Sequence, residues 1–262
     1  MFKLKPDKKT VIFSTVFMIL SVACFVSCIT LCIRGPRPIF VKEDTPKDTV
    51  SSSACLTSTP DYGEYYVNDV IYLADTAFSG IKDAEVLRYG SETLQLWSGS
   101  DGDVSLDAKI ASAQIIFPEN GKEIYIKDAL EAKKPDYLII SLGISNGVPF
   151  CTEEKFKSYY SDLIAAVKEI SPDTKIILQS VLPVSKKYER KTQGVSMEKI
   201  NRANGWIVDI AEENQVKYLH TVSCLKNKDG YLDQKYDSGD GLHLNKDGYI
   251  AVLNYIRTHG YK

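Results

Sequence analysis

Short apolar runs alternate with amphipathic stretches through most of the chain after residue 64. Four runs are uniformly apolar over much of their length, which is typical of buried strands, and they lie at residues 70–73, 136–142, 175–181 and 216–219. A fifth and weaker strand is predicted at residues 85–89. The run at 136–142 ends at Gly143, and the run at 175–181 stops before Pro183.

Amphipathic stretches lie between and after these runs. Apolar residues recur three and four positions apart in residues 156–170, 200–211 and 247–258, which predicts three helices with one buried face each. Asn245 is a suitable N-cap for the last helix. Strands that alternate with helices and are apolar on both faces predict a three-layer α/β sandwich, with a parallel sheet flanked by helices. Active residues in such folds gather at the carboxyl ends of the strands.

The N-terminal part has a different pattern. Residues 11–33 carry no charge, and as a helix they would be about 34 Å long, which is enough to cross a bilayer. Four lysines precede this stretch, so we expect residues 1–10 to be a short cytoplasmic tail, residues 11–33 a single-pass signal anchor in the cell membrane, and the rest extracytoplasmic. The alternative is a cleaved signal peptide, including lipoprotein-type cleavage before Cys24 or Cys28.

Residues 34–63 are predicted to be a linker between this anchor and a domain at residues 64–262. The segment is rich in proline and serine and shows no apolar period.

Composition excludes several classes of protein. The formal net charge is −2 and no basic block is present, so no nucleic-acid partner is expected. The three histidines are not spaced as metal ligands, and no metal site is predicted. Of the six cysteines only Cys55, Cys151 and Cys224 lie outside the apolar stretch, which is no disulfide framework, although a Cys151–Cys224 bridge stays open.

A candidate for chemistry lies near the C-terminus, where Asp240 stands three residues before His243 in a glycine-rich loop. This spacing lets the carboxylate orient the imidazole, which can then take a proton from a hydroxyl nucleophile. Asp-x-x-His alone also occurs by chance in ordinary loops. The loop after the first strand offers Ala74-Asp75-Thr76, and the loop after the strongest strand offers Gly143-Ile144-Ser145-Asn146.

The order and spacing of these three blocks resemble the SGNH (GDSL-type) hydrolase family of esterases and lipases. That family has Gly-Asp-Ser after its first strand, a Gly-x-Asn block after a middle strand, and Asp-x-x-His near its end. The resemblance covers roughly residues 65–262. It implies an enzyme without a cofactor that hydrolyses acyl esters, such as O-acetyl groups of envelope glycans or lipid esters.

Carried over by position, the resemblance makes Thr76 the nucleophile, His243 the general base and Asp240 its orienting partner. Asp75 would support the turn. The expected oxyanion donors are the backbone N–H of Thr76, the side chain of Asn146 and a glycine, for which Gly99 and Gly102 are both candidates. Of the two glycines, Gly99 is the predicted donor.

The chain departs from the family pattern at two places. Thr76 stands for serine, and its methyl group stiffens the side chain and crowds the path of attack. Asn146 follows Gly143 by three residues rather than two. Four alternatives stay open. The nucleophile could be Ser79, and Ser145 could donate a hydrogen bond to the oxyanion. The acyl group could be transferred to another alcohol instead of water, or the domain could be an inactive module that binds an envelope glycan or a partner protein.

Three weaker features are expected to be structural. Asp101, Asp103 and Asp107 lack the spacing of a calcium loop and are interpreted as a solvated loop. The basic residues at 186–191 are interpreted as a solvated surface. Trp97 and Trp206 are predicted to pack in the core.

Overall fold

A five-stranded parallel sheet forms the centre of the computed structural model, which describes residues 52–261. The strand order is β2-β1-β5-β6-β7, with bounds Leu96–Trp97 for β2, Val70–Ala74 for β1, Tyr137–Ser141 for β5, Lys175–Gln179 for β6 and Lys217–Leu219 for β7. Every pairing is parallel. The predicted parallel sheet is therefore confirmed.

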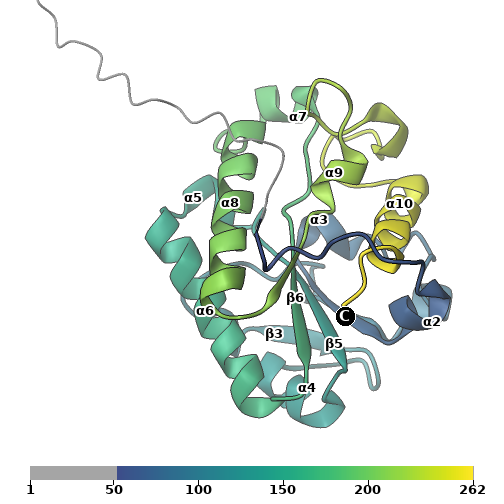
Figure 1. The fold of residues 1–262 in the computed structure, drawn as a ribbon, viewed down its shortest axis with the longest axis vertical. Coiled ribbons are helices and arrows are strands. Elements are labelled where there is room, and N and C mark those ends of the chain that lie inside the picture. Colours follow the sequence, from purple (N-terminus) through teal and green to yellow (C-terminus); the bar gives the residue numbers. More distant parts are fainter. Residues whose placement is uncertain (1–51, 262) are drawn as a thin grey trace, which may run out of the picture. The chain divides into compact units, whose positions relative to one another are not determined.

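Helices cover both faces of this sheet (Figure 1). One face packs against α4 (Ile126–Lys133), α6 (Glu153–Ile170) and α8 (Met197–Glu213), and the other against α2 (Gly63–Asn68), α9 (Val222–Leu225) and α10 (Lys246–Arg257). Alternate strand residues serve the two cores: Ile71 and Leu73 face the first, whereas Val70 and Tyr72 face the second. This explains why the strands are apolar throughout.

The three long helices begin where polar side chains accept hydrogen bonds from their first turns. Thr152 caps α6, Ser196 caps α8, and Asn245 caps α10 by accepting from the backbone N–H of Gly248. The predicted cap at Asn245 is thus confirmed. The remaining short elements are α3 (Thr76–Ser79), α5 (Gly147–Phe150), α7 (Lys186–Lys191), and the 3-10 turns η1 (Gly90–Glu92), η2 (Ile110–Ser112) and η3 (Gln234–Tyr236).

The strand predicted at residues 85–89 is wrong. This segment forms turns, and Glu85 and Tyr89 have positive φ angles of 56° and 69°, which no extended strand accommodates. The strand beside β1 is instead β2, which is only two residues long. A hairpin of β3 (Gln114–Phe117) and β4 (Lys122–Tyr125) was not predicted either, because both strands are short and β4 has no buried residue.

The segment before α2 is hydrogen-bonded to the domain. Leu56 donates its backbone N–H to the carbonyl of Tyr218, and Tyr218 donates to the carbonyl of Ala54. Further along, Thr59 donates to Thr258 and Tyr62 donates to Arg257 through the backbone. The folded unit therefore extends N-terminally of residue 64, because β7 lies at a sheet edge whose N–H and C=O groups find partners in this segment.

Several predicted N-terminal segments lie outside the described residues. These are the tail at residues 1–10, the signal anchor at residues 11–33, and residues 34–51 of the linker. Within residues 52–261, no helix combines the length and the apolar character needed to span a bilayer.

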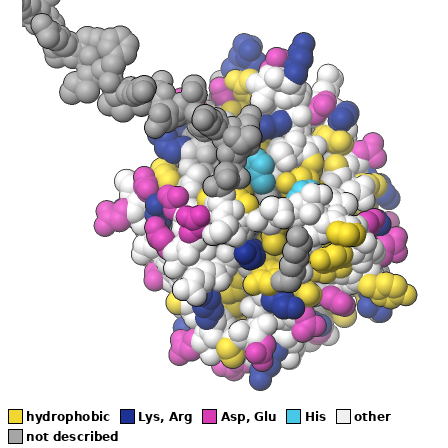
Figure 2. All heavy atoms as spheres, in the orientation of Figure 1, with side chains coloured by type: hydrophobic (Ala, Val, Ile, Leu, Met, Phe, Trp, Pro, Cys, Tyr) yellow, Lys and Arg dark blue, Asp and Glu magenta, His cyan; other side chains and the backbone are white. Residues whose placement is uncertain are grey.

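The structure places three of the cysteines and both tryptophans. Cys55, Cys151 and Cys224 are unpaired, so no Cys151–Cys224 bridge forms in the structure. Trp97 is fully buried, as expected for a core residue, whereas Trp206 is partly buried and packs against Phe156 at the edge of the core, with 5.5 Å between ring centroids. Charged side chains of both signs are interspersed over the face in Figure 2, and Lys and Arg side chains gather at its top, where Figure 1 places α7.

Removing the segment before α2 should destabilise the domain. A protein of residues 64–262 loses the four backbone hydrogen bonds above, and we expect its free energy of unfolding to be about 2–4 kcal/mol lower than that of residues 46–262. Urea denaturation measures the difference. As a control, Asp61→Ala removes the exposed ion pair with Arg257 and an exposed hydrogen bond from the Gly63 N–H, and should change the midpoint much less than the truncation. Equal stability of the two lengths would contradict the prediction.

Candidate active site

Asp75 joins two of the loops that carry candidate residues. It follows β1 directly and is 3% exposed. Its Oδ2 accepts hydrogen bonds from the backbone N–H groups of Gly143 and Ile144, both at 2.8 Å, and its Oδ1 accepts from Ala77 at 3.2 Å. The carboxylate therefore caps α3 and at the same time ties the turn after β1 to the loop after β5.

Burial changes the acidity of this carboxyl group. Loss of solvation raises the pKa of Asp75 to about 7, and the nearby Asp103 carboxylate adds a smaller increase. The backbone hydrogen bonds from Ile144, Ser145 and Ala77 act in the opposite direction and lower this pKa.

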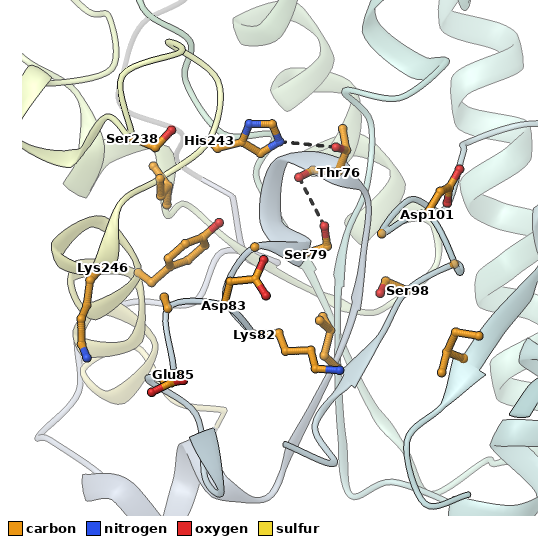
Figure 3. Close-up of a pocket in the computed structure, with 18 of the residues that line it drawn as sticks. Thr76, Ser79, Lys82, Asp83, Glu85, Ser98, Asp101, Ser238, His243 and Lys246 are labelled. Atoms are coloured by element: carbon orange, nitrogen blue, oxygen red, sulfur yellow. Dashed lines mark hydrogen bonds between the residues drawn. The ribbon is translucent and has the colours of Figure 1, made fainter. Parts of the chain in front are cut away.

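Thr76, His243 and Asp240 come together as one hydrogen-bonded series. The Oγ1 of Thr76 lies 3.4 Å from Nε2 of His243, and Nδ1 of His243 lies 2.5 Å from Oδ2 of Asp240 (Figure 3 shows the first contact). The second distance is that of a short, charge-assisted hydrogen bond, and the first is long, as such contacts often are without a ligand. The imidazole thus has one nitrogen on a carboxylate and the other on a hydroxyl.

The loop that carries Asp240 and His243 is held from both sides. The Oδ1 of Asp240 accepts from the backbone N–H groups of Leu242 and His243, at 2.8 and 2.9 Å. Although partial burial raises the pKa of Asp240, its hydrogen bonds to the His243 side chain and to these N–H groups outweigh that effect and lower it to about 2. Asp240 is therefore ionised throughout the neutral range.

Gly241 lets this loop pack closely against the N-terminus of α7. Its φ angle is +89°, its carbonyl accepts from the N–H of Ser185 at 2.8 Å, and a Cβ at this position would collide with the Ser185 side chain. A side chain at residue 241 would therefore displace the segment that holds His243.

The expected oxyanion donors on the backbone already have acceptors. The N–H of Thr76 donates to Oδ1 of Asp103 at 3.0 Å, and the N–H of Gly99 donates to the carbonyl of Asp103 at 3.1 Å. The N–H of Gly102 donates to the carbonyl of Gly99 at 2.9 Å. Gly99 does line the cleft beside Thr76, but its N–H is directed into its own loop.

The structure does not bring Asn146 to the other candidates. It is exposed, it has a left-handed φ of 60°, and its side chain does not cap the helix α5 that follows. It is not among the residues that line the cleft. Asn146 lies inside the turn that follows β5, which closes where Val148 donates its backbone N–H to the Gly143 carbonyl.

The two serine alternatives are also placed. Ser79 lies one helical turn from Thr76, and its hydroxyl donates to the Thr76 carbonyl at 3.4 Å (Figure 3). Ser145 donates its backbone N–H to Asp75 at 3.4 Å, and its carbonyl accepts from Leu106.

A cleft of about 870 Å³ opens beside Thr76 and His243. Figure 3 shows charged and hydroxyl side chains around it. Its lining is mostly polar and includes Ser79, Ser98, Ser100, Ser238, Lys82, Lys246, Asp83, Glu85 and Asp101. The charges are of both signs, which indicates a polar ligand rather than a long apolar one.

The sequence does not identify Asp103 as a neighbour of Thr76, because it resembles Asp101 and Asp107 in a polar loop. With a strand predicted at residues 85–89 instead of β2, nothing in the sequence indicates that residues 98–105 directly follow a strand at the carboxyl edge of the sheet. Among residues 52–261, no three His, Cys, Asp or Glu side chains converge as they would around a metal ion.

Comparison with known proteins identifies the family. Residues 102–251, more than half of the chain, match the model of the GDSL-like lipase/acylhydrolase family. The chain belongs to this family. The matched range includes Asp240 and His243 and begins after Thr76, so it does not bear on threonine in place of serine. The comparison with curated proteins gives no match.

A solved structure shares the fold. A protein from Streptococcus pneumonia, named for platelet activating factor, is 18% identical, covers 72% of this chain and 82% of its own, and superposes with a TM-score of 0.50. A lipolytic protein of the G-D-S-L family from Desulfitobacterium hafniense is 14% identical over 72% of this chain and 97% of its own, with a TM-score of 0.49.

Truncating Asp75 should destabilise the domain strongly. Asp75→Ala leaves the buried N–H groups of Gly143 and Ile144 without their acceptor, and we expect a loss of about 2–5 kcal/mol in the free energy of unfolding. Urea denaturation at neutral pH measures it. Asp107→Ala is the matched control, because the Asp107 side chain is exposed and accepts a hydrogen bond from the Lys109 N–H alone. A loss no larger than that of the control would contradict the prediction.

Asp75 should also give the domain a characteristic pH dependence. From about pH 4 to about pH 7 the folded protein keeps a proton on Asp75 that the unfolded chain has released. The free energy of unfolding therefore falls as the pH rises through this window. We expect the decrease between about pH 4.5 and about pH 8 to be larger in the wild type than in Asp75→Asn, measured by urea denaturation. The same decrease in both proteins would contradict the assignment.

Proposed function

We propose that this chain hydrolyses an acyl ester through a covalent acyl-threonine. Membership of the GDSL-like lipase/acylhydrolase family supports an ester hydrolase in general. The observation that carries the proposal is the series that runs from the Thr76 hydroxyl through both nitrogens of His243 to the ionised Asp240. This is the arrangement by which a hydroxyl group becomes a nucleophile at neutral pH.

The reaction follows from this geometry. Oγ1 of Thr76 attacks the ester carbon while Nε2 of His243 takes its proton, and Asp240 stabilises the imidazolium that forms. The imidazolium then protonates the leaving alcohol, which departs and leaves the acyl group on Thr76. A water molecule, deprotonated by His243, attacks this second ester and releases the carboxylic acid and free Thr76. Transfer of the acyl group to another alcohol would differ only in this last step.

The cleft favours an ester of a polar alcohol. Hydroxyl and charged side chains dominate its lining, and an alkyl chain placed among them would leave polar groups without partners. We therefore favour a short acyl group, such as acetyl, on a hydroxyl-rich compound such as an envelope glycan over a long-chain lipid ester.

A position at the outer face of the cell membrane is part of the proposal. It rests on the uncharged stretch at residues 11–33 and the lysines before it. In this arrangement the substrate is part of the cell envelope, within reach of an anchored domain.

The second candidate is an inactive module that binds a glycan or a partner protein. The position of Asn146 favours it, since this side chain is exposed and does not line the cleft. Losing one oxyanion donor typically costs about 10²–10³ in rate.

Activity of designed variants tests the proposal. We expect Thr76→Ala and His243→Ala each to lower kcat for 4-nitrophenyl acetate by about 10³-fold or more, since each removes one member of a unit that acts together. Thr76→Ser should keep or raise kcat, because it removes the methyl group that crowds the attack. The controls are Ser79→Ala, which removes a neighbouring hydroxyl, and His259→Ala, which removes a histidine outside the cleft; both should stay within a few-fold of the wild type.

Two results would overturn the proposal. If the folded wild type and Thr76→Ser are both inactive towards short esters and O-acetylated glycans, the binding module is favoured instead. If Ser79→Ala abolishes turnover and Thr76→Ala does not, the nucleophile is Ser79.

A further inference from the structure

Asp103 places a carboxylate directly against the residue that carries the proposed nucleophile. Its Oδ1 accepts the backbone N–H of Thr76 at 3.0 Å, and its Oδ2 accepts the hydroxyl of Ser105 at 3.0 Å. Its own carbonyl accepts the N–H of Gly99 at 3.1 Å. Asp103 therefore accepts from two of the three backbone N–H groups considered as oxyanion donors: its side chain accepts from Thr76 and its carbonyl from Gly99.

The position of this carboxylate matters chemically. When a hydroxyl attacks an ester, negative charge develops on the carbonyl oxygen, and an N–H of the nucleophilic residue itself lies within reach of that oxygen. A carboxylate is also the product of ester hydrolysis, so a site that binds the oxyanion binds a carboxylate as well. The Asp103 side chain thus resembles the bound product, but it is attached to the chain.

We propose that the Asp103 carboxylate is an internal occupant of the oxyanion site, and that an ester reacts only after displacing it. This inference rests on the proposed hydrolysis at Thr76. It makes Asp103 a residue that sets which esters react: an ester that binds the cleft well displaces the carboxylate, whereas a small, weakly bound ester does so rarely.

The local geometry allows this displacement. Asp103 is only half-buried, and its contact to Thr76 is made by the side chain, whereas its backbone is held separately by Gly99 and by Oδ1 of Asp101, which accepts the Asp103 N–H at 3.1 Å. Rotation of one side chain therefore frees the Thr76 N–H without unfolding the loop. Asp75, on the other side of Thr76, differs in being buried and held by several N–H groups, so it has no comparable freedom.

The test has a binding arm and a kinetic arm, both with the full-length chain. For binding, the chain is labelled with ¹⁵N-threonine, the Thr76 amide signal is assigned by its loss in Thr76→Ser, and sodium acetate is added as the probe. We expect acetate to shift this signal in a saturable way in Asp103→Ala, with half-saturation at a concentration at least about tenfold lower than in the wild type.

The kinetic arm uses 4-nitrophenyl acetate, a small ester that fills little of the cleft. Since one oxyanion donor is worth about 10²–10³ in rate, Asp103→Ala should raise kcat/KM by about tenfold or more. Asp103→Asn keeps the size and an acceptor but not the charge, and it should fall between the wild type and Asp103→Ala. Asp103→Asn also replaces Asp103→Ala in the test if the alanine variant does not fold. The amide signals of the other threonines show whether each variant is folded. Asp107→Asn removes an exposed carboxylate three residues before η2 begins, and should behave as the wild type because this carboxylate accepts from the Lys109 N–H and not from Thr76.

The outcomes separate this inference from the proposed function. Acetate that fails to shift the Thr76 amide in folded Asp103 variants overturns the inference, as does an active wild type whose turnover is unchanged or lowered by these variants. If acetate binds at Thr76 in Asp103→Ala but no variant, including Thr76→Ser, turns over an ester, Asp103 is confirmed as the occupant of an anion site and the hydrolase proposal fails.

Discussion

The candidate site depends on the hydrogen bonds that the buried Asp75 carboxylate accepts. This carboxylate stands at the end of β1 and accepts N–H groups from the loop after β5, so two neighbouring strands cannot separate at their carboxyl ends without leaving a buried polar group unpaired. Because Asp75 also begins α3, the same contact sets the direction of the next side chain, Thr76. The position of the hydroxyl relative to His243 follows from this contact.

Two carboxylates flank Thr76 and differ in what holds them. Asp75 is enclosed by the protein, and moving it would break several hydrogen bonds at once. Asp103 is half-buried, and a single side-chain rotation separates it from Thr76. The first is suited to fixing the turn, and the second to exchanging with another anion or a developing oxyanion.

The departures from the family pattern act on different parts of the chemistry. Threonine at position 76 keeps the hydroxyl and its contact to His243, so the proton path is retained while the approach of the ester is more crowded. The longer spacing to Asn146 affects the oxyanion instead, because that side chain lies at the surface. The residues for proton transfer, Thr76, His243 and Asp240, are therefore in contact with one another. Stabilisation of an oxyanion would depend on backbone N–H groups that already donate to Asp103.

The amino-acid sequence by itself determined the central strands, the three long helices, the Asn245 cap and the Asp240–His243 pair, because these depend on hydrophobic period and short spacing, which are local. It could not place β2, the β3–β4 hairpin or the segment before α2, since short strands and edge pairing are decided by distant partners. Asp103 belongs to the same class: it meets Thr76 across 27 positions of sequence. Only the tertiary structure, which brings the ends of β1 and β2 together, decided that the side chain of this aspartate accepts the backbone N–H of Thr76.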